Sequence, residues 1–141
     1  MAAKDEKLEL LGKVPLFSGL GRRELERLST LADEVELPAG RVLMRQGERG
    51  EELFVLIDGK VSVQRDGREL PERGGRDIFG EIALVDGGPR SATVTLEAPS
   101  RLLVISHREF HALMDEFPAV RMQVLATLAA RVRDLDASGV H

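Results

Sequence analysis

The chain has 141 residues, of which 43% are hydrophobic and 31% are charged, and its formal net charge is −4. This length suits one domain with a substantial core, and the slightly acidic balance gives no general attraction to nucleic acids or to acidic membranes. Because the chain contains no cysteine, disulfides, thiol nucleophiles and thiolate metal sites are excluded.

The first 33 residues are predicted to be helical. Met1 to Glu9 is charged and shows no secretory signal, and no apolar run approaches the roughly 18 residues of a membrane span. We therefore expect a cytoplasmic domain. The charged and apolar pattern predicts a short helix over Asp5–Leu11, which Pro15 ends, and an amphipathic helix over Arg22–Leu31, where leucines recur at every third position.

The middle of the chain, residues 34–106, has the texture of short antiparallel strands. Turn residues such as Asp58-Gly59 and Asp66-Gly67 separate apolar or alternating runs, and the second pair is typical of a hairpin. The strands are expected at residues 34–37, 42–44, 53–57, 61–63, 92–96 and 102–105. This pattern predicts a mainly β fold with flanking helices, namely an antiparallel jelly-roll β-barrel.

The last part, residues 107–136, is predicted to form C-terminal helices. Ser106 and Glu109 have the spacing of a capping box, and Pro118 suits the first position of a second helix. That helix carries a narrow apolar stripe of Leu125, Leu128, Val132 and Leu135. We interpret residues 1–141 as a single domain.

Residues 79–93 carry the clearest chemistry in the sequence. A glycine turn at Gly80 opens a short apolar helical turn with a carboxylate, Glu81, and a second turn presents Arg90 followed by Ser91. A guanidinium beside free backbone N–H groups suits an anionic phosphate, whereas a carboxylate suits a sugar hydroxyl. The pair indicates a phosphorylated sugar ligand. The alternative is a surface arginine paired with Glu81 or Asp86.

This segment resembles the phosphate-binding cassette of cyclic nucleotide-binding domains, such as those of the catabolite activator protein, protein kinase A regulatory subunits and cyclic nucleotide-gated channels. Phe79–Leu84 and Pro89–Thr93 match its two halves, and Glu81 and Arg90 have the family's separation of nine. Pro71–Asp77 departs from the family's usual approach to the cassette. Further resemblance covers the rest of the chain at Val14–Phe17, Gly40, Gly47 and Leu53–Val61.

The resemblance implies roles for individual residues. Arg90 would bind the cyclic phosphate, helped by backbone N–H groups, and Glu81 with Gly80 would hold the ribose 2′-hydroxyl. The implied ligand site consists of Phe79, Gly80, Glu81, Ile82, Ala83, Arg90, Ser91 and Ala92, with Arg131 and Leu135 of the last helix over the purine.

The function implied is a non-catalytic cyclic nucleotide sensor in which ligand binding repositions the last helix. Ser91 favours cyclic AMP, because threonine at that position often accompanies cyclic GMP binding in the family. The partner is the small-molecule cyclic nucleotide, with no direct nucleic-acid contact and no membrane span. A weak homodimer or an effector domain in another chain stays open.

Other readings remain beside this one. The fold could serve as a ligand-free protein-interaction module, or the chain could be a fragment of a transcription regulator, channel or kinase. His107 and His111 are spaced like a metal-binding pair, but no third ligand is evident. The sequence has no Walker loop, dinucleotide fingerprint or nucleophile elbow, so we do not expect an enzyme.

Overall fold

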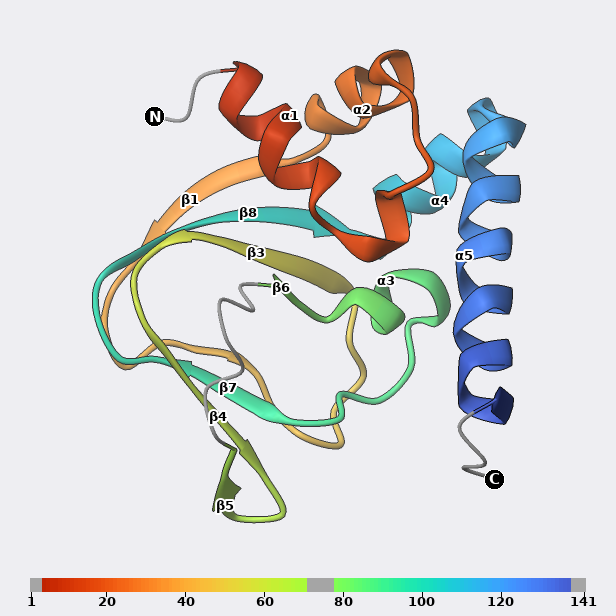
Figure 1. Cartoon of the computed structure of the whole chain (residues 1–141). Coiled ribbons are helices and arrows are strands. Elements are labelled where there is room, and N and C mark those ends of the chain that lie inside the picture. Colours follow the sequence, from red (N-terminus) through yellow and green to blue (C-terminus); the bar gives the residue numbers. More distant parts are fainter. Residues whose placement is uncertain (1–3, 71–77, 138–141) are drawn as a thin grey trace. The chain divides into compact units, whose positions relative to one another are not determined.

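Figure 1 shows a computed structural model of the chain, in which residues 4–70 and 78–137 are described. Within the last helix, the side chains of residues 131 and 135–137 are outside this description. The segment Pro71–Asp77, which departs in sequence from the family's usual pattern, is outside it as well. The chain divides into two compact units. We call residues 31–110 the sheet unit and residues 2–30 with 111–141 the helical unit.

The sheet unit contains two antiparallel four-stranded sheets (Figure 1). The first has the order β1 (Asp33–Leu37), β8 (Ser100–Ser106), β3 (Glu52–Asp58) and β6 (Ile78–Phe79). The second has the order β2 (Val42–Met44), β7 (Thr93–Leu96), β4 (Val61–Arg65) and β5 (Arg68–Glu69). The predicted mainly β jelly-roll fold with flanking helices is confirmed, although the two sheets do not close into one continuous barrel.

A buried cluster joins the two sheets. Phe54 and Leu56 of β3 and Leu102 of β8 come from the first sheet, and Leu96 of β7 comes from the second. Because side chains alternate between the faces of a strand, each strand contributes every second residue to this cluster. Partly buried side chains from other strands extend it, namely Val35, Leu37, Leu43, Val61, Phe79 and Val104. The core thus reaches Phe79, the first residue of the predicted cassette.

Strand β3 is the central support of the sheet unit. It pairs with β8 on one side and with β6 on the other, so that Phe54 lies opposite both Val104 and Phe79. The four residues Leu53–Leu56 are all buried, which agrees with their continuous apolar sequence. The strand therefore holds β6, and with it the start of the cassette, in a fixed register.

The hairpin between β4 and β5 forms where the sequence predicted it. Asp66 and Gly67 make a two-residue turn, and both have positive φ, at 54° and 77°. Two positive φ angles define a type I′ turn, whose twist matches that of the flanking strands. The turn places Arg65 and Arg68 directly opposite each other on the hairpin.

The helical unit contains helices from both ends of the chain. They are α1 (Lys4–Gly12), the 3-10 turn η1 (Pro15–Phe17), α2 (Arg22–Ser29), most of α4 (His107–Glu116) and α5 (Pro118–Ala137). Helix α2 ends two residues before the predicted Leu31. The reason is local: the hydroxyls of Ser29 and Thr30 donate to the carbonyls of Glu26 and Arg27, at 2.7 and 2.6 Å, and close the last turn.

The starts of the two C-terminal helices agree with their predicted signals. The Glu109 N–H donates to Ser106 Oγ over 3.1 Å, so Ser106 caps α4 as predicted. The Glu109 carboxylate accepts from the Ser106 hydroxyl at 2.9 Å instead of from the Ser106 N–H, which completes the cap in a different way. Pro118 begins α5. Among the described residues, no helix has the length and apolar character needed to cross a membrane.

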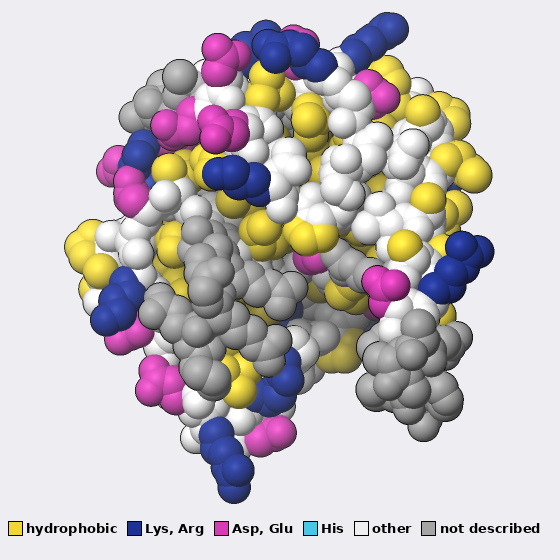
Figure 2. All heavy atoms as spheres, in the orientation of Figure 1, with side chains coloured by type: hydrophobic (Ala, Val, Ile, Leu, Met, Phe, Trp, Pro, Cys, Tyr) yellow, Lys and Arg dark blue, Asp and Glu magenta, His cyan; other side chains and the backbone are white. Residues whose placement is uncertain are grey.

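Two apolar residues of the predicted stripe on α5 are more than half exposed, with 53% for Leu125 and 58% for Val132. On the face shown in Figure 2, basic and acidic side chains are interspersed. The net charge of −4 is therefore not gathered into one acidic patch on this face.

Candidate ligand-binding site

The candidate site begins where β6 ends and the short helix α3 (Glu81–Asp86) starts. Gly80 caps this helix with a left-handed backbone, at φ 87°. A Cβ at this position would lie 2.6 Å from the carbonyl oxygen of Glu52 and would also collide with the Arg90 guanidinium. Two requirements, the positive φ and the lack of space, therefore explain the glycine. The predicted glycine turn and apolar helical turn are both present.

The loop between β2 and β3 holds the second half of the cassette by backbone hydrogen bonds. The Gly50 N–H donates to the Gly88 carbonyl at 2.8 Å, the Arg90 N–H to the Glu48 carbonyl at 2.8 Å, and the Gly47 N–H to the Arg90 carbonyl at 2.9 Å. These three bonds run in both directions between the segments, in the manner of a short antiparallel ladder. The backbone of Arg90 is therefore fixed on both sides.

The side chain of Arg90 is buried, with an exposed fraction of only 6%. Its Nη1 donates to the carbonyl oxygen of Glu52 at 2.8 Å, and its Cζ lies 5.8 Å from the centre of the Phe54 ring. This second contact is within the range of a cation–π interaction. A Cβ on Gly50 would lie 2.6 Å from Arg90 Cδ, so the absence of a side chain at Gly50 makes room for the arginine.

Arg90 has no ion pair with a carboxylate among the described residues. The alternative reading, a surface arginine paired with Glu81 or Asp86, is therefore wrong. Burial lowers the pKa of the Arg90 guanidinium from its ordinary value, and the nearby charge of Glu52 acts in the opposite direction. Arginine stays charged at neutral pH in any case. The site therefore contains a buried positive charge, which the Glu52 carbonyl oxygen and the Phe54 ring hold in place.

The other predicted residues of the cassette surround this arginine. Glu81 and Ala83 are buried in the first turn of α3, with 8% and 7% exposed, while Ile82 is 50% exposed. Ser91 is exposed and Ala92 is buried, and Phe79 is partly buried opposite Phe54. The structure thus gathers Phe79–Ala83 and Arg90–Ala92 at the ends of β6 and β7. Arg131 and Leu135 belong to α5, but their side chains are outside the described part of the structure.

The histidine pair is not a metal site in the described part of the chain. There, no group of three or more histidine, cysteine or acidic side chains is placed to hold an ion. His107 Nδ1 instead lies 2.8 Å from the Leu84 carbonyl oxygen. Since a carbonyl can only accept, this nitrogen donates, and the histidine binds the last turn of α3 to the start of α4.

Sequence reasoning missed four residues that shape the site. Gly50 gives Arg90 its space, Glu52 supplies the carbonyl that Arg90 binds, Phe54 lies beneath the guanidinium, and Arg65 donates to Ser91. Gly50 could have been suspected from the glycine spacing in residues 47–50, since a loop glycine often marks a close approach. The others carry no local signal, because strand pairing alone brings them to the cassette.

A comparison with protein families identifies the scaffold. The family described as "Cyclic nucleotide-binding domain" matches residues 34–117, which is more than half of the chain. The chain belongs to this family. The matched region contains all but the first residue of β1, all of β2–β8, α3 and α4, and so the whole arrangement around Arg90.

Curated relatives of this cyclic nucleotide-binding domain come from proteins with different outputs. A CRP-like cAMP-activated global transcriptional regulator from Mycobacterium tuberculosis is 31% identical, over 89% of the chain and 58% of its own length. A cyclic nucleotide-gated potassium channel from Rhizobium etli is 33% identical, over 87% of the chain and 34% of its own length. The chain thus spans only about a third to three fifths of these relatives.

Solved structures show the same fold. The N-terminal domain of a transcriptional regulator from Streptomyces coelicolor superposes with a TM-score of 0.81 at 33% identity, covering 92% of this chain and 93% of that one. The regulatory domain of Toxoplasma gondii PKA, crystallised with cAMP, has a TM-score of 0.69 at 30% identity, covering 78% and 44%.

Replacing Gly50 by alanine should displace the Arg90 side chain. The new methyl group would overlap the guanidinium stem, and overpacking of this kind costs about 1–3 kcal/mol of unfolding free energy. Denaturant unfolding of the free chain measures the loss. Gly12→Ala is the matched control, because a Cβ there meets only Leu25 Cδ1 at 3.9 Å, an ordinary contact. Equal stability of the two variants would show that Gly50 does not shape the site.

Proposed function

We propose that this domain is a non-catalytic cyclic nucleotide sensor and that its ligand is cyclic AMP. The observation that carries the proposal is the buried guanidinium of Arg90, which lies so close to Gly80 that no side chain fits there, within a cyclic nucleotide-binding domain. Glu81, the residue after Gly80, is also buried, so a cation and a carboxylate are available for a ligand whose phosphate and ribose hydroxyl belong to one molecule.

The phosphate end is built around Arg90. A guanidinium carries several N–H donors in a rigid fork, and the bond to the Glu52 carbonyl uses only Nη1. The remaining donors are available to the exocyclic oxygens of a cyclic phosphate. The N–H groups of Ile82 and Ala83 lie in the first turn of α3, where no helical carbonyl precedes them as a partner. Together these groups offer charge and directed donors to one anion.

The ribose end is built around Glu81. Its side chain is buried in the first turn of α3, and we propose that it accepts a hydrogen bond from the ligand, which an analogue without that hydroxyl would lose. A ribose 2′-hydroxyl can donate to it, whereas a second anion at this position would be repelled. This arrangement favours a ribonucleotide that carries a single phosphate charge near Arg90.

The proposed base rests on Ser91, and the proposed output rests on the relatives of the domain. Ser91 is exposed next to Arg90 and can donate to the phosphate or to a purine edge, and we favour adenine for it. The relatives join this domain to transcription-regulator and channel outputs, and one similar structure holds cAMP. This domain is compatible with a part in a longer regulator, channel or kinase, with a weak homodimer, or with an effector in another chain. A cytoplasmic location remains a prediction.

A protein-interaction module without ligand is the second candidate function. The exposed apolar residues Ile82, Met122, Leu125 and Val132 are the observation in its favour. The buried guanidinium of Arg90 speaks against it, because a buried charge without an ion pair among the described residues is costly unless a ligand compensates it. A binding measurement separates the two functions.

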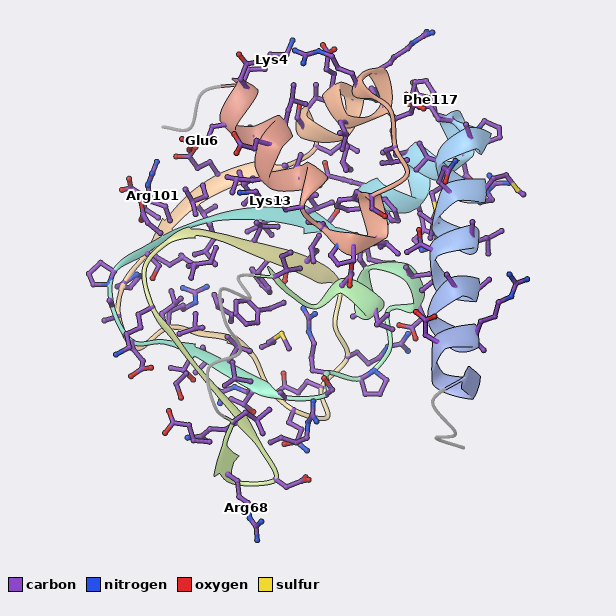
Figure 3. All side chains as sticks on the ribbon, viewed as in Figure 1. Lys4, Glu6, Lys13, Arg68, Arg101 and Phe117 are labelled. Carbon is purple, nitrogen blue, oxygen red and sulfur yellow. The ribbon has the colours of Figure 1, made fainter. Side chains whose placement is uncertain are left out.

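Calorimetric titration with cyclic AMP, cyclic GMP and 5′-AMP tests the proposal directly. We expect binding of cyclic AMP, weaker binding of cyclic GMP and none of 5′-AMP. Arg90→Ala should weaken cyclic AMP binding by roughly 10- to 150-fold, because it removes charge-assisted hydrogen bonds. Arg68→Ala is the control, since Figure 3 shows Arg68 at the outer end of the hairpin, pointing away from the sheets. Absence of binding to both cyclic nucleotides would favour the interaction module.

The role of Glu81 is tested by a ligand that lacks its partner. Wild-type protein should bind 2′-deoxy cyclic AMP about tenfold more weakly than cyclic AMP, because the buried carboxylate loses a donor. The Glu81→Ala variant should bind the two ligands equally. Comparing both proteins with both ligands isolates the contact between Glu81 and the 2′-hydroxyl. If the variant keeps the wild-type preference, the 2′-hydroxyl is read elsewhere.

We further propose that the ligand repositions α5, with Arg131 and Leu135 over the purine. A ligand can shift such an equilibrium only if it binds one state more tightly than the other, and we propose that cyclic AMP binds more tightly to the state in which α5 covers it. Cyclic AMP should therefore slow amide hydrogen exchange across residues 120–136. The control is Arg90→Ala at the same ligand concentration, where protection should be lost. Unchanged exchange in wild-type protein at saturating ligand would contradict the switch.

A further inference from the structure

The tip of the β4–β5 hairpin is fastened to the loop that follows β2. Gln46 and Asp66 exchange two hydrogen bonds, in which Gln46 Nε2 donates to Asp66 Oδ1 and the Asp66 N–H donates to Gln46 Oε1, both at 2.8 Å. The Gln46 N–H also donates to the Thr93 hydroxyl at 2.9 Å. One residue therefore links the hairpin turn to Thr93, the first residue of β7 and the last residue of the cassette.

Arg65, next to this turn, reaches the cassette itself. Its Nε donates to the carbonyl oxygen of Ser91 at 3.0 Å, and its side chain is exposed. Among the described residues, no carboxylate forms an ion pair with it, and the neighbouring Asp66 carboxylate accepts from Gln46 instead. In contrast, Arg22, Arg27, Arg101 and Arg121 all pair with acidic side chains. In the described part of the chain, the Arg65 charge beside Ser91 therefore has no acidic partner.

The bond to Ser91 fixes the direction of a backbone donor. The chain contains no cis peptide in its described part, so the Ser91 carbonyl and the Ala92 N–H point to opposite sides of one planar peptide. Holding the carbonyl from the hairpin side aims the Ala92 N–H away from the hairpin. Arg65 thus controls the orientation of the peptide that directly follows Arg90 and Ser91.

We infer that Arg65 is a positioning residue for the phosphate end of the ligand site. It acts in two ways: it orients the Ser91–Ala92 peptide through the carbonyl, and it adds a second positive charge beside the buried one of Arg90. The inference rests on the proposed function, and it adds to it a residue that lies on another strand and outside the cassette. The group that it serves is the ligand's anionic phosphate.

The test compares two arginines of the same hairpin. Arg65 and Arg68 lie opposite each other, both are exposed, and each substitution by alanine removes one charge from the same place in the fold. Titration with cyclic AMP should show about three- to tenfold weaker binding for Arg65→Ala and wild-type affinity for Arg68→Ala. Arg65→Lys should recover most of the affinity, because it restores the charge and a donor. The thermal midpoints of the free variants should match, since neither side chain is buried.

A measurement without ligand reports on the contact itself. In a nitrogen–proton correlation spectrum of the free chain, the Ala92 amide signal should move in Arg65→Ala and stay in Arg68→Ala. Equal cyclic AMP affinities of these two variants would overturn the inference while leaving the proposed function intact. If the wild-type chain bound no cyclic nucleotide, the proposed function would fail and this inference would fail with it.

Discussion

The burial of one guanidinium governs this domain. Removing a charge from water is costly, and Arg90 offsets that cost with a carbonyl oxygen, an aromatic ring and a close fit against glycine backbone, without an ion pair in the described part of the chain. These contacts do not include a negatively charged group in an ion pair. Burial therefore lowers the pKa of the Arg90 side chain. An anion in this site would supply the missing negative charge, so its binding would stabilise the fold by simple linkage.

The architecture around Arg90 follows from this requirement. A buried arginine must be held by its backbone as well as by its side chain, and the hydrogen bonds between the segments at 47–50 and 88–90 do this. The Glu52 carbonyl is available because β3 ends its pairing with β6 at Phe54. Gly50 and Gly80 approach the guanidinium more closely than any side chain could. The strands thus bring four parts of the chain together at the Arg90 guanidinium, namely the segment 47–50, β3, Gly80 and the segment 88–90.

The sequence predicted the fold class, the cassette and six of the strands, because each rests on a local pattern, whereas the two-residue strands β5 and β6 were not predicted as strands. Alternation located β1 and β4, and the pair Asp66-Gly67 located the hairpin. Local patterns cannot say which strand lies opposite which, so the contacts of Glu52 and Arg65 with the cassette were not predictable. The helix end at Ser29 was misplaced for a related reason: two hydroxyls bond back to carbonyls and override the leucine periodicity.

Any movement of α3 must be transmitted through contacts that already exist at its end. Within the sheet unit, His107 joins α3 to the first turn of α4, since its Nδ1 donates to the Leu84 carbonyl while its backbone N–H donates to the Glu51 carbonyl at 2.6 Å. Glu51 directly precedes Glu52, whose carbonyl holds Arg90. His107 is therefore connected both to the end of α3 and, through the strand that holds the Arg90 guanidinium, to Arg90. Because α4 begins at His107 and continues into the residues of the helical unit, a bound anion could influence this helix along the chain through His107.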